Sequence, residues 1–357
     1  MPKTKRILFT ALNWGLGHAS RTIPLIQKAI ALDLQPYLAA EGEALALWQE
    51  QFPNLPHIKL PPYNIRYPSQ NMSWNMAQQL PQILRAMAKE QALLPKLVNK
   101  YQISVLLNDN RYGCYLSSLP SAFLGHQLRI AFPYRWQKSL LQPLNRFLLQ
   151  KHKLIWLPDY QGEANLSGQL GQDLPWPNIR YIGPLSRLQN TDIQQKDYEI
   201  VALLSGPEPQ RQYLEEELRQ KLALLPQKSL IIRGKIRATE TKLNGDYPHI
   251  LPYATGQELA SFLLSAKLLV LRAGYSSLMD LAQLKAGAML LCPTPGQTEQ
   301  EYLAQRLARQ GRAQQQPQNQ LQLPLAWAQK DHFLPHWPQK EQPDLSPFFQ
   351  ELLDLTQ

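Results

Sequence analysis

A histidine follows two glycines directly after the first apolar stretch of the chain. Residues 7–12 (ILFTAL) predict a buried strand, and residues 13–18 (NWGLGH) predict a loop that opens a helix. Gly15 and Gly17 let the backbone approach a ligand closely, because glycine has no side chain and tolerates positive φ. His18 ends the loop, and an imidazole with a pKa near neutrality suits a general base. The segment therefore predicts a ligand-facing loop with a candidate base.

The same loop only weakly indicates a dinucleotide site. The third glycine of the dinucleotide fingerprint is absent, and Arg21 stands where it would fall. Residues 19–32 carry apolar side chains at helical spacing, so we expect a helix there. For His18, at the start of this helix, the alternative to a functional role is a structural or capping residue.

Two more polar clusters follow predicted strands of the first half. Residues 103–107 and 121–124 predict apolar strands, and ligands of open α/β sheets bind beyond the carboxyl ends of the strands. The clusters are residues 108–113 (NDNRYG) and 125–127 (GHQ). A single carboxylate between two amides is a poor Mg²⁺ site, so we interpret residues 108–110 as a turn. The candidate binding residues in the two clusters are Asn110, Arg111, His126 and Gln127.

The second half holds a strand–helix–strand–helix unit over residues 268–302. Strands are predicted at 268–271 and 288–292, and a helix follows each of them. Both helix N-termini would lie beyond the carboxyl ends of parallel strands, where free N–H groups suit a phosphate. The polar side chains expected there are those that a nucleotide-sugar needs, namely Arg272, Ser276, Asp280 and Gln300.

Part of this polar pattern also has the spacing of helix caps. Ser277-x-x-Asp280 and Thr298-x-x-Glu301 both match the capping box. Glu301 is therefore either a cap or a ligand contact. Asp280 is likewise either a cap or a ligand contact.

The elements that must position these residues follow one scheme in both halves, although no sequence repeat is present. Residues 199–204 begin a new apolar strand, and Ser205 and Gly206 open a second glycine loop. A Pro-rich stretch that ends at Arg187, followed by polar residues 189–196, predicts the inter-domain linker. We expect an α/β protein with two Rossmann-like domains. Their predicted limits are 1–187 and 188–330, with a 331–357 tail whose last helix packs back on the first domain.

Composition indicates a globular enzyme. Of 357 residues, 44% are hydrophobic and 18% charged, and no apolar run is long enough to span a membrane. The basic N-terminus runs into a polar loop, unlike a signal peptide. Cys114 and Cys292 provide neither a disulfide framework nor a metal cluster, so we expect a cytoplasmic setting. The net charge of +10 suggests an anionic partner, such as a membrane surface, and no nucleic-acid signature accompanies it. A basic solvated surface without a partner is the alternative.

The pattern as a whole resembles the GT-B glycosyltransferases, most closely the branch of UDP-glycosyltransferases that acts on a lipid-linked muramyl acceptor of peptidoglycan. The resemblance covers most of the chain and is strongest at residues 13–21, 126–127 and 272–302. It implies two Rossmann-like domains that face each other across a cleft. It also implies inverting, metal-independent transfer of N-acetylglucosamine or another hexose from a UDP-sugar to an acceptor hydroxyl, in cell-envelope, lipid or polysaccharide synthesis. No cofactor is implied beyond the donor substrate. Peripheral association with the inner membrane face is a further expectation.

The resemblance also implies roles for individual residues. His18 matches the histidine of the family's glycine loop and is the expected base. Asp280 matches the carboxylate that holds the ribose hydroxyls, and Tyr253 the residue beside the uracil. Gln127 stands where that family has glutamate. The expected donor contacts are Gly15, Gly17, Ser205, Gly206, Arg211, Arg233, Tyr253, Arg272, Gly274, Ser276, Asp280, Gln300 and Glu301, and the expected acceptor contacts are Asn110, Arg111, His126 and Gln127. Arg211 and Arg233 are included because each lies at a predicted strand end or helix start, and a surface position without a ligand is the alternative for both.

Two other functions remain open on sequence grounds. A UDP-sugar 2-epimerase would keep the fold and need no acceptor, and a non-catalytic nucleotide-sugar binding protein would show no turnover. The Asn110-Arg111-Tyr112 cluster and the lack of an obvious acidic pair favour transfer over epimerisation.

Overall fold

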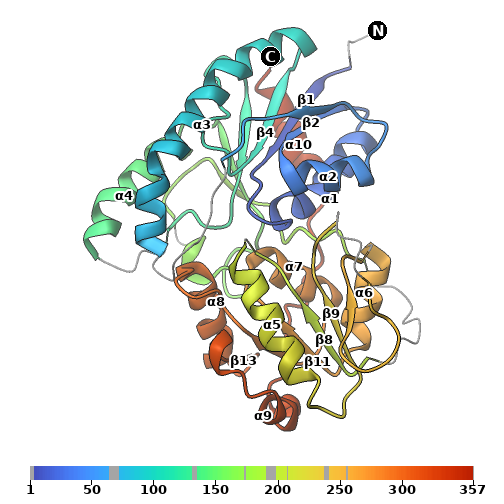
Figure 1. Ribbon diagram of the computed structural model, residues 1–357. Helices are drawn as coiled ribbons and strands as arrows, with labels where there is room; N and C mark the ends of the chain where they lie inside the picture. Colours follow the sequence, from blue (N-terminus) through green and yellow to red (C-terminus); the bar gives the residue numbers. More distant parts are fainter. Residues whose placement is uncertain are drawn as a thin grey trace. The chain divides into compact units, whose positions relative to one another are not determined.

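The computed structural model describes residues 4–63, 72–130, 135–172, 174–189, 198–206, 208–236, 241–254 and 256–356. The described chain forms two units, each built on its own parallel sheet (Figure 1). The second unit contains Ser186–Gln339, and the first contains most of the chain up to Leu185 together with Lys340–Gln357. The linker expected at residues 189–196 lies almost wholly outside the described residues.

The first unit has a seven-stranded parallel sheet in the order β3-β2-β1-β4-β5-β6-β7 within the described chain. This is a doubly wound order that reverses direction between β1 and β4, which are hydrogen-bonded neighbours. The strands are β1 (Arg6–Ala11), β2 (Gln35–Ala40), β3 (His57–Lys59), β4 (Val105–Asp109), β5 (Ser121–Leu124), β6 (Leu154–Leu157) and β7 (Ile179–Tyr181).

Helices cover both faces of this sheet (Figure 1). They are α1 (Gly17–Ala31), α2 (Gly42–Gln51), α3 (Met72–Tyr101), α4 (Arg135–Leu149) and α10 (Ser346–Asp354), with a 3-10 turn at Gly168–Leu170. The core side chains of α3 pack with Leu106, and Leu149 of α4 packs with Phe123 and Ile155. Leu106 and Asn108 share a face by strand alternation, and Asn108 pairs with Phe123, so α3 and α4 lie on the same face.

The last helix of the chain belongs to the first unit. The ring of Phe349 in α10 lies 5.2 Å from the ring of Trp156 in β6, centroid to centroid. Arg180 adds two hydrogen bonds from its Nε and Nη2 to the Glu351 carboxylate, the shorter of 2.6 Å. Trp156 alternates with Ile155 along β6, so α10 covers the face opposite to α4.

The second unit repeats the architecture with a six-stranded parallel sheet of order β10-β9-β8-β11-β12-β13. A single apolar core of Ile, Leu, Val and Ala side chains fills the space between this sheet and α5 and α9. The strands are β8 (Ile200–Leu203), β9 (Ser229–Ile232), β10 (His249–Leu251), β11 (Leu268–Leu271), β12 (Met289–Leu291) and β13 (Gln314–Gln315). The helices are α5 (Gln210–Leu222), α6 (Gly256–Ser265), α7 (Tyr275–Leu284), α8 (Thr298–Arg309) and α9 (Leu323–Ala328), with 3-10 turns at Gln318–Gln320 and Lys330–His332.

Two parallel sheets with flanking helices confirm the predicted α/β class. Among the described residues, no helix is both long and apolar enough to cross a membrane.

Candidate active site at the β1–β4 switch point

His18 stands at the start of α1, just after the loop that leaves β1. Gly15 adopts φ 77° in this loop, a left-handed conformation that favours glycine. The residue that caps α1, Leu16, makes no side-chain cap, and the His18 side chain bonds to Asp109 instead of the helix backbone. The capping alternative for His18 is therefore excluded by its contacts.

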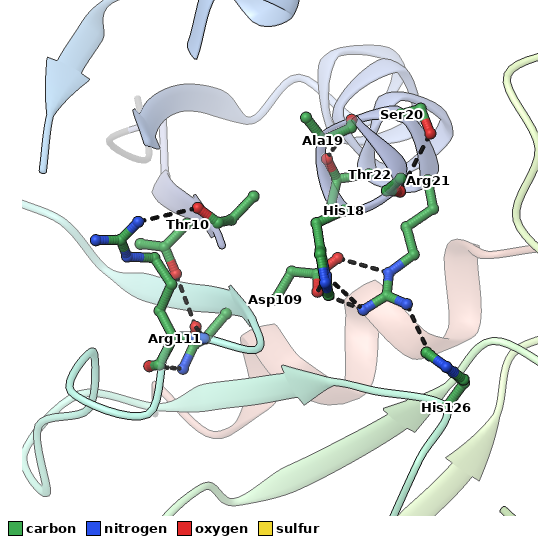
Figure 2. A network of polar contacts seen from close by, with 12 residues as sticks. Thr10, His18, Ala19, Ser20, Arg21, Thr22, Asp109, Arg111 and His126 are labelled. Atoms are coloured by element: carbon green, nitrogen blue, oxygen red, sulfur yellow. Dashed lines mark hydrogen bonds and ion pairs between the residues drawn. The ribbon is translucent and has the colours of Figure 1, made fainter. Parts of the chain in front are cut away.

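Asp109 is the partner of His18, and it ends β4. Because β4 is the neighbour of β1, with Ala11 opposite Asp109, the end of β4 faces the start of α1. Oδ1 of Asp109 lies 2.7 Å from Nδ1 of His18. Arg21 binds the same carboxylate through Nε, 2.7 Å from Oδ2, and through Nη2, which donates to Oδ1 (Figure 2). The Asp109 side chain is fully buried.

These contacts fix the proton on the His18 ring. Nδ1 of His18 lies 2.7 Å from the Asp109 carboxylate, which can only accept, and 3.1 Å from Arg21 Nη2, which can only donate. We assign the hydrogen by the shorter contact, so Nδ1 donates to Asp109 and Arg21 Nη2 donates to the same carboxylate. Nε2 is then the unprotonated nitrogen. In the part of the chain that the structure describes, Nε2 has no hydrogen-bond partner, and 13% of the side chain is exposed. A general base that takes a proton from a ligand needs such an unprotonated and accessible nitrogen.

The surroundings of His18 favour its neutral form. Burial lowers the pKa of His18 below its usual value, the Asp109 carboxylate raises it again, and the charge of Arg21 lowers it further. Burial opposes ionisation of Asp109, but the charges of Arg21 and His18 outweigh it and hold the pKa of Asp109 below its usual value. The site thus pairs an ionised carboxylate with an unprotonated imidazole at neutral pH.

His126 joins the same network from the segment after β5. Arg21 Nη1 donates to His126 Nδ1 over 2.9 Å, and the His126 side chain is 6% exposed. Asn110 and Gln127, each only half-buried, flank these residues, with Asn110 at φ 56° directly after Asp109. The structure therefore brings the expected residues His18 and His126 together.

The expected acceptor contact Arg111 is wrong. Its guanidinium is 0% exposed and lies in the core, where Nε bonds Glu90 at 2.5 Å and Nη2 donates to Pro61 O over 2.7 Å. Tyr63 OH donates to the other Glu90 oxygen over 2.7 Å. Because every direction around this side chain is protein, Arg111 anchors the segment that ends at Tyr63 and cannot reach a ligand.

Arg272 in the second unit is also buried, and its expected donor contact is likewise wrong. Its side chain is 0% exposed and donates to the carbonyl oxygens of Cys292 and Gln210 and to Oε1 of Gln318. Burial lowers the pKa of Arg272 to about 10. The residue joins β11, β12 and α5, so it holds the sheet end together.

The other two arginines that were expected to contact the donor, Arg211 and Arg233, form ion pairs and hydrogen bonds with neighbouring protein groups. Arg211 donates to Glu208 over 2.9 Å and to Gly234 O over 3.2 Å, which links the loops after β8 and β9. Arg233 lies 2.9 Å from the Glu215 carboxylate. Gly206 adopts φ 94°, and apart from its chain neighbours no atom lies within 4 Å of where its side chain would start. Open space therefore lies beside the Ser205–Gly206 part of the loop after β8.

Polar side chains in the first turn of α8 form hydrogen bonds with the loop that precedes the helix. Gln300 accepts a hydrogen bond from Thr294 N over 2.9 Å and donates to Gln297, and Glu301 accepts one from Gly296 N over 2.8 Å. No side chain caps α8 at its N-cap residue, so Glu301 stabilises the preceding loop and not a capping box with Thr298.

Asp280 also does not act as a cap. Helix α7 begins at Tyr275 with Gly274 as its N-cap, so Ser277 already lies inside the helix. Ser276, next in the first turn, is half-buried. Oδ1 of Asp280 accepts a hydrogen bond of 2.6 Å from the Ser186 hydroxyl. Burial raises the pKa of Asp280 to about 6, partly offset by this hydrogen bond.

Next to this pair, Arg187 Nη1 donates to Tyr253 OH over 2.6 Å, and its guanidinium lies over the Tyr253 ring. Asp280 and Tyr253 are thus both joined to the first residues of the second unit. Among the described residues, no group of three His, Cys, Asp or Glu side chains could hold a metal ion.

Solved structures resemble this chain in fold. Sequence comparison finds no matching family and no matching curated protein. The glycosyltransferase SnogD from Streptomyces nogalater matches with a TM-score of 0.62 at 13% identity, covering 99% of this chain and 100% of that one. The spinosyn rhamnosyltransferase SpnG matches at 0.58 and 18% identity, covering 91% and 90%. MurG of Acinetobacter baumannii matches at 0.53 and 14% identity, covering 99% of both chains. The chain has the GT-B fold.

In this GT-B chain the first-unit site contains two residues to which the sequence interpretation gave no functional role. Asp109 was interpreted as part of a turn, but Asn108 and Asp109 end strand β4, and the Asn108 amide donates to Arg111 O and Cys114 O in the segment that follows. Arg21 was noted only as the residue that replaces a glycine. Its spacing of three residues after His18 puts both side chains on one face of α1, and that spacing was a usable signal.

Proposed function

We propose that this protein transfers a sugar from a UDP-sugar to a hydroxyl group of an acceptor. The observation that carries the proposal is the 2.7 Å contact between His18 and Asp109 at the carboxyl end of the first sheet. It leaves Nε2 of His18 free to accept a proton and Asp109 in place to stabilise the imidazolium. The GT-B fold supports the proposal because the similar structures are glycosyltransferases.

The proposed reaction is a single displacement. The acceptor oxygen bonds to the anomeric carbon of the donor sugar, the bond from that carbon to the diphosphate oxygen breaks, and UDP leaves. His18 Nε2 takes the hydroxyl proton as the new bond forms. A single displacement with no protein nucleophile inverts the anomeric configuration. The helix N-terminus that opens at Gly274 supports metal-independent stabilisation of the leaving diphosphate.

The donor sugar is proposed to be N-acetylglucosamine or another hexose, with Asp280 and Tyr253 on the nucleoside. Incubation of the protein with UDP-N-acetylglucosamine and a panel of other UDP- and TDP-sugars, followed by NMR, tests this. Release of UDP with a new glycoside on an added acceptor supports transfer. Formation of an epimer without any acceptor would show a 2-epimerase, and a thermal shift without turnover would show a binding protein.

A base assignment needs a histidine control. His18→Ala should lower kcat by about 10²–10⁴-fold, the usual effect of losing a general base. His57→Ala changes a half-buried histidine on β3, outside the network of Asp109 and Arg21, and should leave kcat near that of the parent protein. Equal turnover of the two variants would contradict the role of His18.

Association with an anionic membrane surface is proposed for the acceptor side. Leu80 and Leu84 of α3 and Leu144 and Phe147 of α4 expose between 52% and 62% of their surface. Between residues 64 and 158 the only carboxylates are Glu90 and Asp109, both buried, so the charge of this region's surface is basic. Exposed apolar side chains among basic ones are typical of helices that lie in a lipid interface.

Sedimentation with vesicles tests the membrane proposal. The protein should bind vesicles that contain phosphatidylglycerol and not pure phosphatidylcholine, and the double substitution Leu144→Gln with Phe147→Gln should weaken binding. Leu224→Gln, which changes a residue 84% exposed in the second unit, is the matched control. Equal binding by both variants would remove α4 from the contact.

A further inference from the structure

Arg21 lies at the centre of the first-unit site, with its side chain 1% exposed. Each guanidinium nitrogen has a partner within the network. Nε donates to Asp109 Oδ2 over 2.7 Å, Nη2 donates to Asp109 Oδ1, and Nη1 donates to His126 Nδ1 over 2.9 Å. Figure 2 shows Arg21 reaching from α1 between the Asp109 carboxylate and the His126 ring.

We propose that Arg21 is a positioning residue that fixes opposite protonation patterns on His18 and His126. A guanidinium has donors only, so His126 Nδ1 must accept from Arg21. His126 is then neutral and carries its hydrogen on Nε2. The Asp109 carboxylate accepts from His18, which therefore carries its hydrogen on Nδ1. One arginine and its carboxylate thus select Nδ1–H on one ring and Nε2–H on the other.

Arg21 also balances the charge next to the base. The groups that face His18 are Asp109 from β4, Arg21 from its own helix and His126 from the segment after β5. Asp109 alone would favour a protonated His18. Arg21 neutralises that carboxylate in a two-point ion pair and places a positive charge 3.1 Å from His18 Nδ1, so a second positive charge on the imidazole is opposed.

The effect of Arg21 on catalysis rests on the proposed function. With Arg21 in place, Nε2 of His18 has its lone pair available at neutral pH and the ring cannot rotate without losing the Asp109 bond. Without Arg21, the histidine would hold its proton to higher pH and His126 would lose the donor that selects its tautomer.

Nitrogen-15 NMR of the full chain with labelled histidine tests this without any substrate, because the two ring nitrogens have distinct shifts in each tautomer. The parent protein should show Nδ1–H on His18 and Nε2–H on His126. In Arg21→Met the titration midpoint of His18 should rise by about 1–3 pH units, the usual effect of a nearby charge. The share of the Nε2–H tautomer on His126 should then fall. Arg21→Lys, which keeps the charge, should hold the His18 midpoint near that of the parent.

Arg111→Met is the matched control, since Arg111 is an equally buried arginine of the same unit that pairs with Glu90. It should lower the melting temperature without moving either histidine. Unchanged His18 and His126 signals in Arg21→Met would overturn the proposal and leave Arg21 a structural residue. If Arg21→Met does not fold, a raised His18 midpoint in Arg21→Lys would overturn it as well.

Activity gives an independent signature. Arg21→Met should lose turnover near neutral pH and regain it at alkaline pH, where His18 is again unprotonated, whereas a merely destabilised enzyme would not recover. If the parent protein shows the expected tautomers but has no transferase activity, the role of Arg21 in the network stands and the proposed function is wrong.

Discussion

Oδ1 of Asp109 lies 2.7 Å from Nδ1 of His18, although 91 residues separate them in the chain. The sheet order brings them together, because β1 and β4 are neighbours and the chain reverses direction between them. In Asp109→Asn the amide can present either an oxygen or an NH₂ group to the imidazole, so Nδ1–H is no longer enforced. We expect kcat to fall by about 10²–10⁴-fold, measured as UDP release with a saturating acceptor.

The control for that substitution is Asp159→Asn. Asp159 is also 0% exposed, but it accepts hydrogen bonds from the backbone of Leu166 and Ser167 and so holds a loop. The Asp159→Asn variant should be less stable than the parent protein and retain its kcat. If both asparagine variants lose activity in proportion to their loss of folded protein, Asp109 has no role in the reaction.

The acid side of the pH profile should report His18. Burial, together with the charge of Arg21, lowers the pKa of His18 below the usual value near 6.5. Only the unprotonated ring can accept the acceptor proton, so activity is lost as the pH falls through this lowered pKa. The acid limb of kcat/KM is therefore expected below about pH 6.5, and a limb above that value would contradict the assignment.

Asp280 offers a test of the donor side. Its Oδ1 already accepts the Ser186 hydroxyl, and further lone pairs of the carboxylate remain for a ribose hydroxyl. Loss of a hydrogen bond to a charged group is worth about 1.5–3 kcal/mol, so Asp280→Ala should weaken UDP binding by roughly 10–100-fold in calorimetry. Ser186→Ala removes the protein's own donor and should leave the affinity equal or higher. Unchanged affinity in Asp280→Ala would rule out the ribose contact.

Arg111 should matter for stability and not for binding. Arg111→Met leaves the carboxylates of Glu90 and Glu41 in the core without their cation, and breaking a buried pair in this way costs about 3–5 kcal/mol. Denaturant unfolding measures that loss. Below the unfolding midpoint, KM for the acceptor should not change. A rise in KM without a loss of stability would restore Arg111 as a binding residue.

The regular elements were largely predictable from apolar spacing. Residues 268–271 were expected to form a strand, and β11 spans Leu268–Leu271. The sequence interpretation passed over α2, whose Ala44, Leu47 and Trp48 have helical spacing and are buried. It also passed over β7, a three-residue edge strand that is half-buried on both sides and has no alternation to detect.

The site was only half predictable, for a physical reason. His18 could be found because glycine and histidine types carry local meaning. Asp109 could not, since a carboxylate between two asparagines predicts a turn until its strand is known to lie beside β1. Arg272 and Arg111 were misjudged for the complementary reason, because a strand-end arginine can turn into the core as easily as towards a ligand.

The return of the chain to the first unit affects the order in which the protein can fold. Lys5 Nζ donates to Leu353 O over 3.0 Å and to Thr356 Oγ1 over 2.7 Å, so the two ends of the described chain are joined there. The second unit is therefore an insertion within the first. During synthesis the sheet surface around Trp156 stays bare until α10 leaves the ribosome, after the whole second unit has emerged. A nascent chain halted near Gln339 would thus carry a finished second unit on an unfinished first one.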